Sequence, residues 1–385
     1  MVWASSYSFL LYIWHTLTGL CGVGKRVFIL GKRHLTCQRV LGEGGFGTVF
    51  EVIDSTENRA YALKEIRASR VDVEREISAH NSVRHKNVVP LIDYVIEVGS
   101  NGQTIIGQGG KRRGGAANDI DEDMTTTVID IPGSPPRRRA LIPSAANDDT
   151  GLCVHALFLF PLFQSGTLHD AIVHALNNTH HHHRSGETPI FIGEALCERD
   201  AALICAGAAR GLAALHAAGF SHRDVNPRNI LVTRGNGVFS SSSITDLGSA
   251  VTPVIQLLPS RHNAARVEEE AETRTSAPFR SPELWSCEYG AIPLDGAAAD
   301  AWALGCTLFA AIIGVSPFEC VAGAGGTLIV CESSHLRVLG PPIWPTSHGT
   351  KISPAFKSIV MALLSRDPKS RLTVTEAAVA LEKLL

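Results

Sequence analysis

Residues 222–232 have the sequence His222-Arg223-Asp224-Val225-Asn226-Pro227-Arg228-Asn229-Ile230-Leu231-Val232. Charged and amide side chains stand here in a fixed order before an apolar run that is typical of a buried strand. Asp224 precedes Asn229 by five residues, and Asp246 follows after a predicted hairpin. This spacing can bring one carboxylate to a hydroxyl group and two further groups to metal ions. Phosphoryl transfer needs that arrangement.

The His-Arg-Asp triplet, with an asparagine five residues after its aspartate, resembles the catalytic loop of eukaryotic protein kinases. The resemblance implies a two-lobed α+β fold, with a small antiparallel β lobe that holds one helix and a larger, mainly helical lobe. It also implies ATP and Mg²⁺ as cofactors and transfer of the γ-phosphate to serine or threonine hydroxyls of protein substrates, with autophosphorylation as a further expectation.

The resemblance also assigns a role to each residue of the loop. Asp224 is expected to accept or orient the proton of the substrate hydroxyl, and His222 to brace the loop. Asn229 and Asp246 are expected to hold the magnesium ions. Arg223 is expected to pair with an anionic group of the activation segment.

One position departs from the pattern of serine/threonine kinases, which carry lysine two residues after the catalytic aspartate. Asn226 stands there, and an amide can donate a hydrogen bond but brings no positive charge to the transferring phosphoryl group. Arg228 occupies the position of the arginine that tyrosine kinases use for the same task, so it is a candidate catalytic residue beside Lys64, Asp224, Asn229 and Asp246. Two alternatives stay open: a non-catalytic pseudokinase or nucleotide-binding scaffold, and a dual-specificity kinase.

Glycines at 42, 44 and 47 have the Gly-x-Gly-x-x-Gly spacing, in which a hairpin backbone can approach phosphate oxygens. Tyr61-Ala62-Leu63-Lys64 follows as a strand that ends in a lysine able to reach the phosphates. Glu74 and Glu76 are both available to pair with Lys64, and Glu76 is favoured by the corner sequence that comes after it. The run Leu159–Phe163 is expected to lead into the hinge, with the backbones of Pro161 and Phe163 facing adenine and Phe160 behind it. The candidate nucleotide-binding residues are Leu41, Gly42, Glu43, Gly44, Gly45, Phe46, Gly47, Val49, Ala62, Lys64, Glu76, Pro161 and Phe163.

The segment between Asp246 and Glu283 is predicted to be the activation segment. Ser276 occupies the place where kinases that act on Ser or Thr keep a hydroxyl beside the catalytic aspartate. An acidic run comes before it, and one of its glutamates is a candidate partner for Arg223 without phosphorylation; the run comprises Glu268, Glu269, Glu270 and Glu272. Asp300 is expected to cap the catalytic loop, and Arg371 to form a buried ion pair with Glu283.

Several of these stretches together resemble the Numb-associated kinase group, and within it the myristoylated and palmitoylated serine/threonine kinases. They are Leu41–Phe46, Tyr61–Lys64, Leu159–Leu168 and Asp246-Leu247-Gly248-Ser249 in place of Asp-Phe-Gly. The resemblance covers about residues 25–385 apart from two insertions. That family is attached to membranes through an acylated Met-Gly start, whereas this sequence begins Met1-Val2, so myristoylation is not carried over.

The domain organisation follows from shifts in composition. Residues 1–24 are apolar; the small lobe is expected at 25–160, the hinge at 161–166 and the large lobe at 167–385. Residues 99–152 are expected to be a disordered insertion, because their mixed charges and low hydrophobicity cannot offset the entropy of ordering. Residues 177–190, which include His180 to His183, are expected to be a solvated insertion.

The overall composition points to a cytoplasmic protein. The chain has 35 basic and 37 acidic residues among 385, so no global field favours nucleic acid, and no nucleic-acid partner is expected. Nine scattered cysteines without a Cys-x-x-Cys pair indicate reduced thiols. Residues 1–24 leave three alternatives: a transmembrane helix, an interfacial membrane contact, or a disordered or wrongly assigned start.

Overall fold

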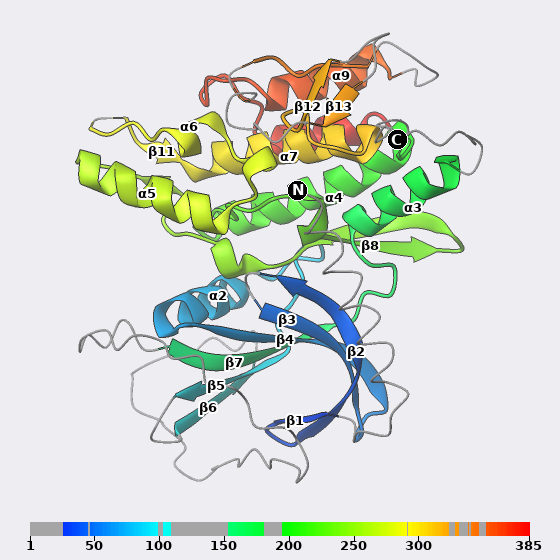
Figure 1. The fold of residues 1–385 in the computed structure, drawn as a ribbon, viewed down its shortest axis with the longest axis vertical. Coiled ribbons are helices and arrows are strands. Elements are labelled where there is room, and N and C mark those ends of the chain that lie inside the picture. The colour runs from blue at the N-terminus through cyan, green and yellow to red at the C-terminus, as the bar shows by residue number, and fades with distance from the viewer. Residues whose placement is uncertain are drawn as a thin grey trace, which may run out of the picture.

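The chain folds into two lobes (Figure 1), as the computed structural model of residues 26–44, 47–98, 103–108, 153–180, 195–290, 292–322, 328–330, 338, 340–345 and 352–385 shows. A β-sheet with one helix forms the lobe at the bottom of the view, and helices dominate the lobe above it. The expected α+β fold of two lobes is confirmed. Residues 1–24, Gly45 with Phe46, 109–152 and 181–190 lie outside the described residues, so the expectations for them stay predictions.

The small lobe is built on a seven-stranded antiparallel sheet with the order β1-β2-β3-β4-β7-β5-β6. Its strands are β1 (Val27–Leu30), β2 (Arg33–Gly44), β3 (Gly47–Asp54), β4 (Arg59–Ser69), β5 (Asp93–Val98), β6 (Gln103–Gln108) and β7 (Cys153–Pro161). Alternate residues of β3 and β4 point to the core, and Val52 and Leu63 are fully buried there. Val49 pairs with Lys64 across β3 and β4, which brings the lysine beside the glycine-containing hairpin.

Strand β6 corrects the expectation that all of residues 99–152 are disordered. Residues 103–108 pair with β5 in an antiparallel register that sets Ile105 opposite Ile96. The sequence Gln-Thr-Ile-Ile-Gly-Gln contains three β-branched residues, which favour extended backbone, and β5 offers an unpaired edge. An average over the whole insertion hides this short strand.

Helix α2 (Arg70–Ser82) joins the sheet to the large lobe. Its first turn is capped by Ser69, whose hydroxyl accepts a hydrogen bond from the Asp72 backbone N–H at 3.2 Å. Val73 and Ile77 lie one turn apart on one face and pack against the sheet residues Phe158 and Phe160. The same helix carries Glu76, so packing of its apolar face positions that carboxylate.

The large lobe packs around two helices of small and apolar residues, α4 (Glu198–Ala217) and α7 (Gly296–Ile313). The other elements are α3 (Leu168–His180), η2 (Pro227–Asn229), β8 (Ile230–Gly235), β9 (Val238–Ile244), η3 (Leu247–Ser249), β10 (Ile255–Gln256), α5 (Arg261–Arg274), η4 (Ala277–Phe279), α6 (Pro282–Trp285), β11 (Leu294–Asp295), β12 (Cys320–Ala322), β13 (Leu328–Val330), α9 (Pro354–Leu363) and α10 (Val374–Glu382). Among the described helices, α7 is long and apolar enough to cross a membrane, but it is 89% buried, as expected for a core helix.

Helix α3 corrects the start of the predicted histidine-rich insertion. The helix continues to His180, so residues 177–180 are helical rather than part of a loop. Asn177 and Asn178 are weak helix formers, but each residue added to an existing helix gains a backbone hydrogen bond without a new nucleation cost.

The buried ion pair expected between Arg371 and Glu283 is present. The Arg371 side chain is fully buried and its guanidinium donates to both Glu283 carboxylate oxygens, at 2.6 and 3.1 Å. Arg371 also donates to the backbone carbonyl of Ala298 at the start of α7, at 2.7 Å. The pair therefore fastens the end of the activation segment to the core of the large lobe.

Candidate active site

Lys64 of β4 lies between two carboxylates from different parts of the chain. Its Nζ is 2.8 Å from Glu76 Oε1 on α2 and 2.7 Å from Asp246 Oδ1 in the large lobe. Burial opposes the charged form of Lys64, but the negative charges of Asp246 and Glu76 raise its pKa. The lysine charge in turn holds the pKa of Asp246 below its usual range despite burial. The favoured partner, Glu76, is therefore the one found, whereas Glu74 pairs with Arg70 on the helix surface.

The glycine-containing hairpin joins β2 to β3, and β3 lies beside Lys64 through the pairing of Val49 with that residue. A side chain at Gly42 or Gly44 would meet no atom within 4 Å, so these two positions leave open space beside the backbone. Gly47 differs, because its φ of +126° is strained for other residues and an added Cβ would lie 2.1 Å from the Glu65 carbonyl oxygen on β4. Two glycines thus fit an approaching phosphate, and the third is required by the sheet itself.

Asp300 of α7 fixes the backbone of the catalytic loop. The carboxylate accepts the backbone N–H groups of His222 at 2.7 Å and Arg223 at 2.8 Å, and His216 contacts it at 2.8 Å. His222 is buried and its Nε2 is 3.0 Å from the Thr245 carbonyl oxygen, which ties the loop to Asp246. Arg223 (φ 70°) and Asp246 (φ 60°) both have left-handed backbones, a strained conformation that these contacts maintain.

Hydrogen bonds from the loop and from the activation segment hold Asp224. Its Oδ2 accepts from the Asn229 amide at 2.9 Å, and its Oδ1 accepts from the Ser276 backbone N–H at 2.8 Å. The Asn229 amide also donates to the Asp224 carbonyl at 2.8 Å. The structure therefore brings together Asp224, Asn229 and Ser276, with the carboxylate aligned by both the loop and the activation segment.

Asn226 has a structural role in this arrangement. Its amide nitrogen donates to the Asp224 carbonyl at 3.1 Å and to the Ser276 hydroxyl at 3.2 Å. Its side-chain oxygen accepts the Arg228 backbone N–H at 2.9 Å and so caps the short helix η2. The residue that replaces the expected lysine thus links the loop to the segment that carries Ser276.

The remaining oxygens suit magnesium. Among the described residues, none donates to the side-chain oxygen of Asn229 or to Oδ2 of Asp246. Hard oxygen ligands of this kind suit Mg²⁺, which is bound through one or two protein groups together with substrate phosphates rather than in an all-protein cage. Accordingly, no cluster of three or more His, Cys, Asp or Glu able to hold a metal is found in the described part of the chain.

The apolar wall of the interlobe region combines predicted residues with one that was missed. Ala62, Phe163 and Leu231 all pack on the cluster that contains the buried Phe160. Leu231 belongs to β8 of the large lobe, and its sequence context predicted only a place in a buried strand. The signal that could have found it is its place two residues after Asn229, where the strand must face the small lobe. Pro161 ends β7, Val49 is half-buried and Leu41 is exposed.

The expected acidic partner of Arg223 is wrong. Arg223 is buried, and its guanidinium donates to Gln256 of β10 at 3.0 Å and to the Ser221 hydroxyl at 3.3 Å. The glutamates lie instead on α5, because Ser260 caps a helix there by accepting the Asn263 backbone N–H. Burial lowers the pKa of Arg223, and a neutral amide serves as its partner.

Charged side chains of helix α5 form ion pairs with α2. Arg274 is 2.7 Å from Asp72, and Arg75 is 3.3 Å from Glu270. The Ser249 hydroxyl donates to the Arg274 carbonyl at 2.8 Å, so η3 joins the same contact. We call Asp72, Arg75, Glu270 and Arg274 the α2–α5 network. It connects the helix that carries Glu76 to the activation segment.

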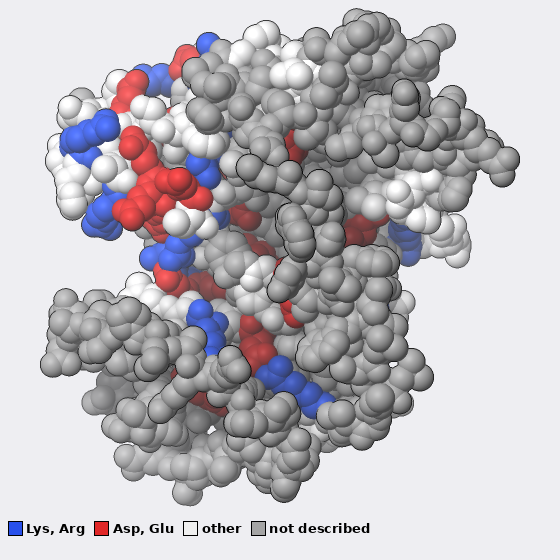
Figure 2. Space-filling view, viewed as in Figure 1, with Lys and Arg blue, Asp and Glu red and all other residues white. Residues whose placement is uncertain are grey.

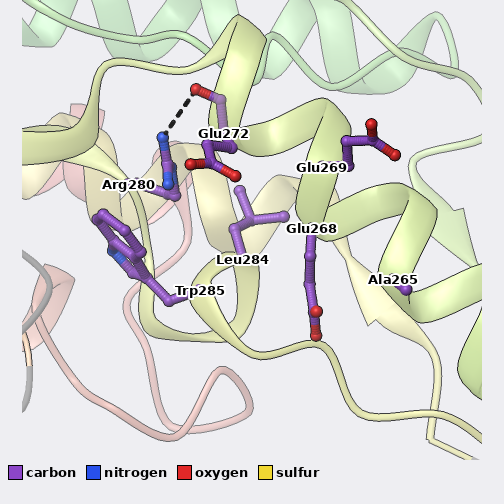
Figure 3. Close-up of a pocket in the computed structure, with 7 residues that line it drawn as sticks. All are labelled: Ala265, Glu268, Glu269, Glu272, Arg280, Leu284 and Trp285. Carbon is purple, nitrogen blue, oxygen red and sulfur yellow. Dashed lines mark hydrogen bonds between the residues drawn. The ribbon is translucent and has the colours of Figure 1, made fainter.

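An acidic pocket of about 350 Å³ lies on the other side of α5, apart from the nucleotide residues. Figure 2 shows the acidic side chains that gather over α5, with basic side chains around them. In Figure 3 the Arg280 side chain extends between Trp285 and Glu272, and it donates to the Glu272 carbonyl oxygen at 3.4 Å. The lining residues are Ala265, Glu268, Glu269, Glu272, Arg280, Leu284 and Trp285.

Comparison with known proteins agrees with this geometry. Residues 35–106 and 162–380 match the protein kinase domain family. The sequence is 26% identical over 349 residues to serine/threonine-protein kinase 16 of Mus musculus, which covers 90% of this chain and 88% of that protein, and the Homo sapiens protein matches to the same extent. The serine/threonine-protein kinase ksg1 of Schizosaccharomyces pombe is 33% identical over 172 residues, 42% of this chain and 25% of that protein. The resemblance to the myristoylated and palmitoylated kinases is confirmed.

Proposed function

Since the chain belongs to the protein kinase family, we propose that it is an active enzyme that transfers the γ-phosphate of ATP to serine and threonine hydroxyls of proteins. One observation carries this proposal. The buried contact of Lys64 with Glu76 and Asp246 is formed at the same time as the contact of Asp224 with Asn229. Both halves of a phosphoryl-transfer site are therefore in place together.

The residues divide the task by position. Lys64 and the open hairpin at Gly42 and Gly44 bind the ATP phosphates, and Asn229 with Asp246 binds magnesium, which neutralises charge on the phosphates when bound. Asp224 accepts the proton of the incoming hydroxyl, held in place by Asn229 and by the Ser276 backbone. Proton acceptance by a positioned carboxylate contributes about 10²–10⁴-fold to such reactions.

The preference for serine and threonine is supported by Ser276. Its hydroxyl contacts Asn226 and its backbone contacts Asp224, so the segment that meets the acceptor residue is fixed close to the carboxylate. The matches to serine/threonine kinases favour the same class. Arg228 would permit tyrosine as a second acceptor, and identification of the phosphorylated amino acid separates the two classes.

The decisive test is phosphate incorporation from labelled Mg-ATP into the protein itself and into a generic Ser/Thr substrate, beside the Asp224→Asn variant. We expect incorporation on serine and threonine by the wild type, and a loss of about 10²-fold or more in the variant. If the wild type incorporates no more phosphate than the variant while still binding Mg-ATP, the protein is a pseudokinase and the proposal is wrong.

We also propose a cytoplasmic location, supported by the described cysteines, which are all free thiols. Membrane attachment through residues 1–24 is the competing idea. Fractionation of cells that express the chain with and without residues 1–24 distinguishes them. A membrane fraction that depends on this segment would overturn a purely cytoplasmic location.

A further inference from the structure

Arg228 is an exposed charge on the catalytic loop that the fold does not use. It lies in η2, four residues after Asp224, and its side chain is exposed. Its backbone N–H donates to Asn226, but its guanidinium has no hydrogen bond or ion pair with any described residue. Arg223, on the same loop, is buried and hydrogen-bonded. An arginine that folding leaves free at this place is available to a ligand.

The loop holds Arg228 in a fixed position. The Asn226 side chain caps η2 through the Arg228 backbone, and both N–H groups of its amide are engaged by the Asp224 carbonyl and the Ser276 hydroxyl. Asn226 therefore cannot move without breaking three hydrogen bonds. Because the backbone of Arg228 is anchored in this way, its side chain projects from a rigid base rather than from a mobile loop.

The charge of Arg228 acts on the start of α3. η2 packs against the start of α3, where burial and then the Arg228 charge lower the pKa of His169. The acidic group nearest in sequence to His169 is Asp170, and its carboxylate already accepts the backbone N–H and the hydroxyl of Thr167, both at 2.8 Å. No carboxylate among the described residues pairs with Arg228.

The position of Arg228 relative to Asp224 indicates which ligand it meets. Ser276 of the activation segment contacts the Asp224 carboxylate, and η2, which begins beside both residues at Asn226, packs against α3. In Figure 1, α3 and α5 are at opposite sides of the large lobe. A substrate chain whose hydroxyl reaches Asp224 therefore passes near Arg228, because the short helix that carries Arg228 begins at Asn226, beside Asp224.

We propose that Arg228 is a specificity-determining residue, which binds an anionic side chain on one flank of the phosphorylated serine or threonine. The proposal rests on the proposed kinase activity and names the class of substrate. An extended chain advances about 3.3–3.6 Å per residue, so the anionic group lies roughly two to four residues from the acceptor. The planar guanidinium can bind a carboxylate or a phosphate with two parallel hydrogen bonds.

This role differs from neutralisation of the transferring phosphoryl group, which the sequence pattern suggests for Arg228. Neutralisation acts on every substrate alike and raises kcat, whereas binding of a substrate side chain acts only on peptides that carry the anion and lowers their KM. The two roles are therefore separable by measuring several peptides with one set of variants.

The experiment uses the full chain and serine peptides that differ at one position. Alanine, glutamate, phosphoserine or lysine is placed in turn at each of about four positions on either side of the acceptor. The kcat and KM of the wild type are compared with those of Arg228→Ala and Arg228→Glu. Arg234→Glu, an exposed arginine on β8, is the matched control for charge reversal.

We expect the wild type to prefer glutamate over alanine by roughly tenfold in kcat/KM at one position on one flank, mostly through KM. Phosphoserine at that position distinguishes a preference for a phosphorylated substrate from a preference for a carboxylate. Arg228→Ala should abolish the preference, Arg228→Glu should transfer it to lysine, and Arg234→Glu should retain it.

Four results would overturn the proposal, three of them seen with the peptides and one with ATP. The three seen with the peptides are a wild type without any anionic preference, a preference that persists in Arg228→Glu, and an equal fall in kcat for all peptides in Arg228→Ala. A rise in the KM for ATP alone would assign Arg228 to the nucleotide and would also contradict it. Failure of the proposed function is a separate result, because then no peptide is phosphorylated above the Asp224→Asn level.

Discussion

Two groups of ion pairs connect α2 to the large lobe, and they have similar distances but different surroundings. The inner group joins Lys64 to Glu76 and Asp246 at 2.7–2.8 Å, with side-chain exposures of 8%, 4% and 24%. The α2–α5 network includes a pair at 2.7 Å, but its side chains are 20–37% exposed. Distance alone therefore says little about energy, because a charge pair near water is screened and a buried one is not.

The two groups also act on the same helix. Asp72 and Glu76 lie four residues apart, so they occupy one face of α2. The α2–α5 network fixes the position of that face relative to α5. In this position Glu76 can contact Lys64. The inner group therefore holds the residues of the proposed reaction, and the more exposed α2–α5 network aligns the helix that carries one of them.

The largest effect is expected from Lys64→Met, which breaks the inner group. The variant leaves the buried Glu76 and the partly buried Asp246 without their cation, and removal of one partner of a buried pair costs about 3–5 kcal/mol of stability. Loss of a fixed charge at the phosphates should also reduce kcat/KM by roughly 10²–10³-fold.

Thermal unfolding and phosphate incorporation measure the two effects, with exposed Lys86→Met as the control. Activity within a few-fold of the wild type in a folded Lys64→Met protein would contradict the role given to Lys64.

A smaller effect is expected in the α2–α5 network. A double-mutant cycle of Asp72→Asn and Arg274→Gln should give a coupling of about 0.5–1 kcal/mol, because the pair is partly exposed. Activity should fall by several-fold, since α2 becomes less well aligned, and the coupling should weaken as salt rises toward about 1 M.

The control for this cycle lies on the same helix. Arg70 and Glu74 form an exposed pair at 2.8 Å that touches neither α5 nor Lys64. Its cycle should give about 0.3–0.5 kcal/mol without any change in activity. Equal losses of activity in the two cycles would show that α2 is merely sensitive to charge.

The smallest effect on activity is expected in a third group, in which pH can remove the charge. His155 of β7 contacts Glu65 and Glu97, and Arg26 also pairs with Glu65. Hydrogen bonds to Glu65 and Glu97 raise the pKa of His155 to about 9. A raised pKa stabilises the fold fully below the unfolded value of about 6.5, and the contribution is lost as pH rises through about 9.

Unfolding midpoints of the wild type and His155→Gln should therefore differ at pH 6 and converge toward pH 9, with other titrations cancelling in the difference. A difference that stays constant over this range would show that His155 acts through packing alone.

The sequence predicted the parts of the site that chemistry constrains most tightly. Asp224, Asn229 and Asp246 must stand at set spacings, and the pair of Lys64 with Glu76 depends on one strand and one helix of defined length. The partner of Arg223 could not be predicted in the same way. Gln256 lies in β10, a strand of two residues that pairs with the distant β11, and local sequence does not show this pairing.

Other misses have a similar physical origin. The role of Asn226 depends on a contact with Ser276, which lies fifty residues further along the chain. The local sequence shows that the positive charge of the expected lysine is missing, but it does not show the hydrogen bonds that the asparagine forms instead. Strand β6 is too short to stand out from a polar insertion, although the edge of β5 accepts it. Long-range pairing decided each of these cases, whereas local spacing decided the predicted ones.

In genetic terms, the three glycines of the hairpin are not equivalent. Substitution of Gly47 forces a side chain onto the carbonyl of Glu65, so a missense change there acts as a folding defect and lowers the amount of protein. Changes at Gly42 or Gly44 meet open space, so we expect the protein to accumulate normally and, under the proposed function, to lose only its binding of the nucleotide. An inherited variant in one short motif would thus produce an absent protein or an abundant inactive one, and the second kind can compete with a normal copy for its substrates.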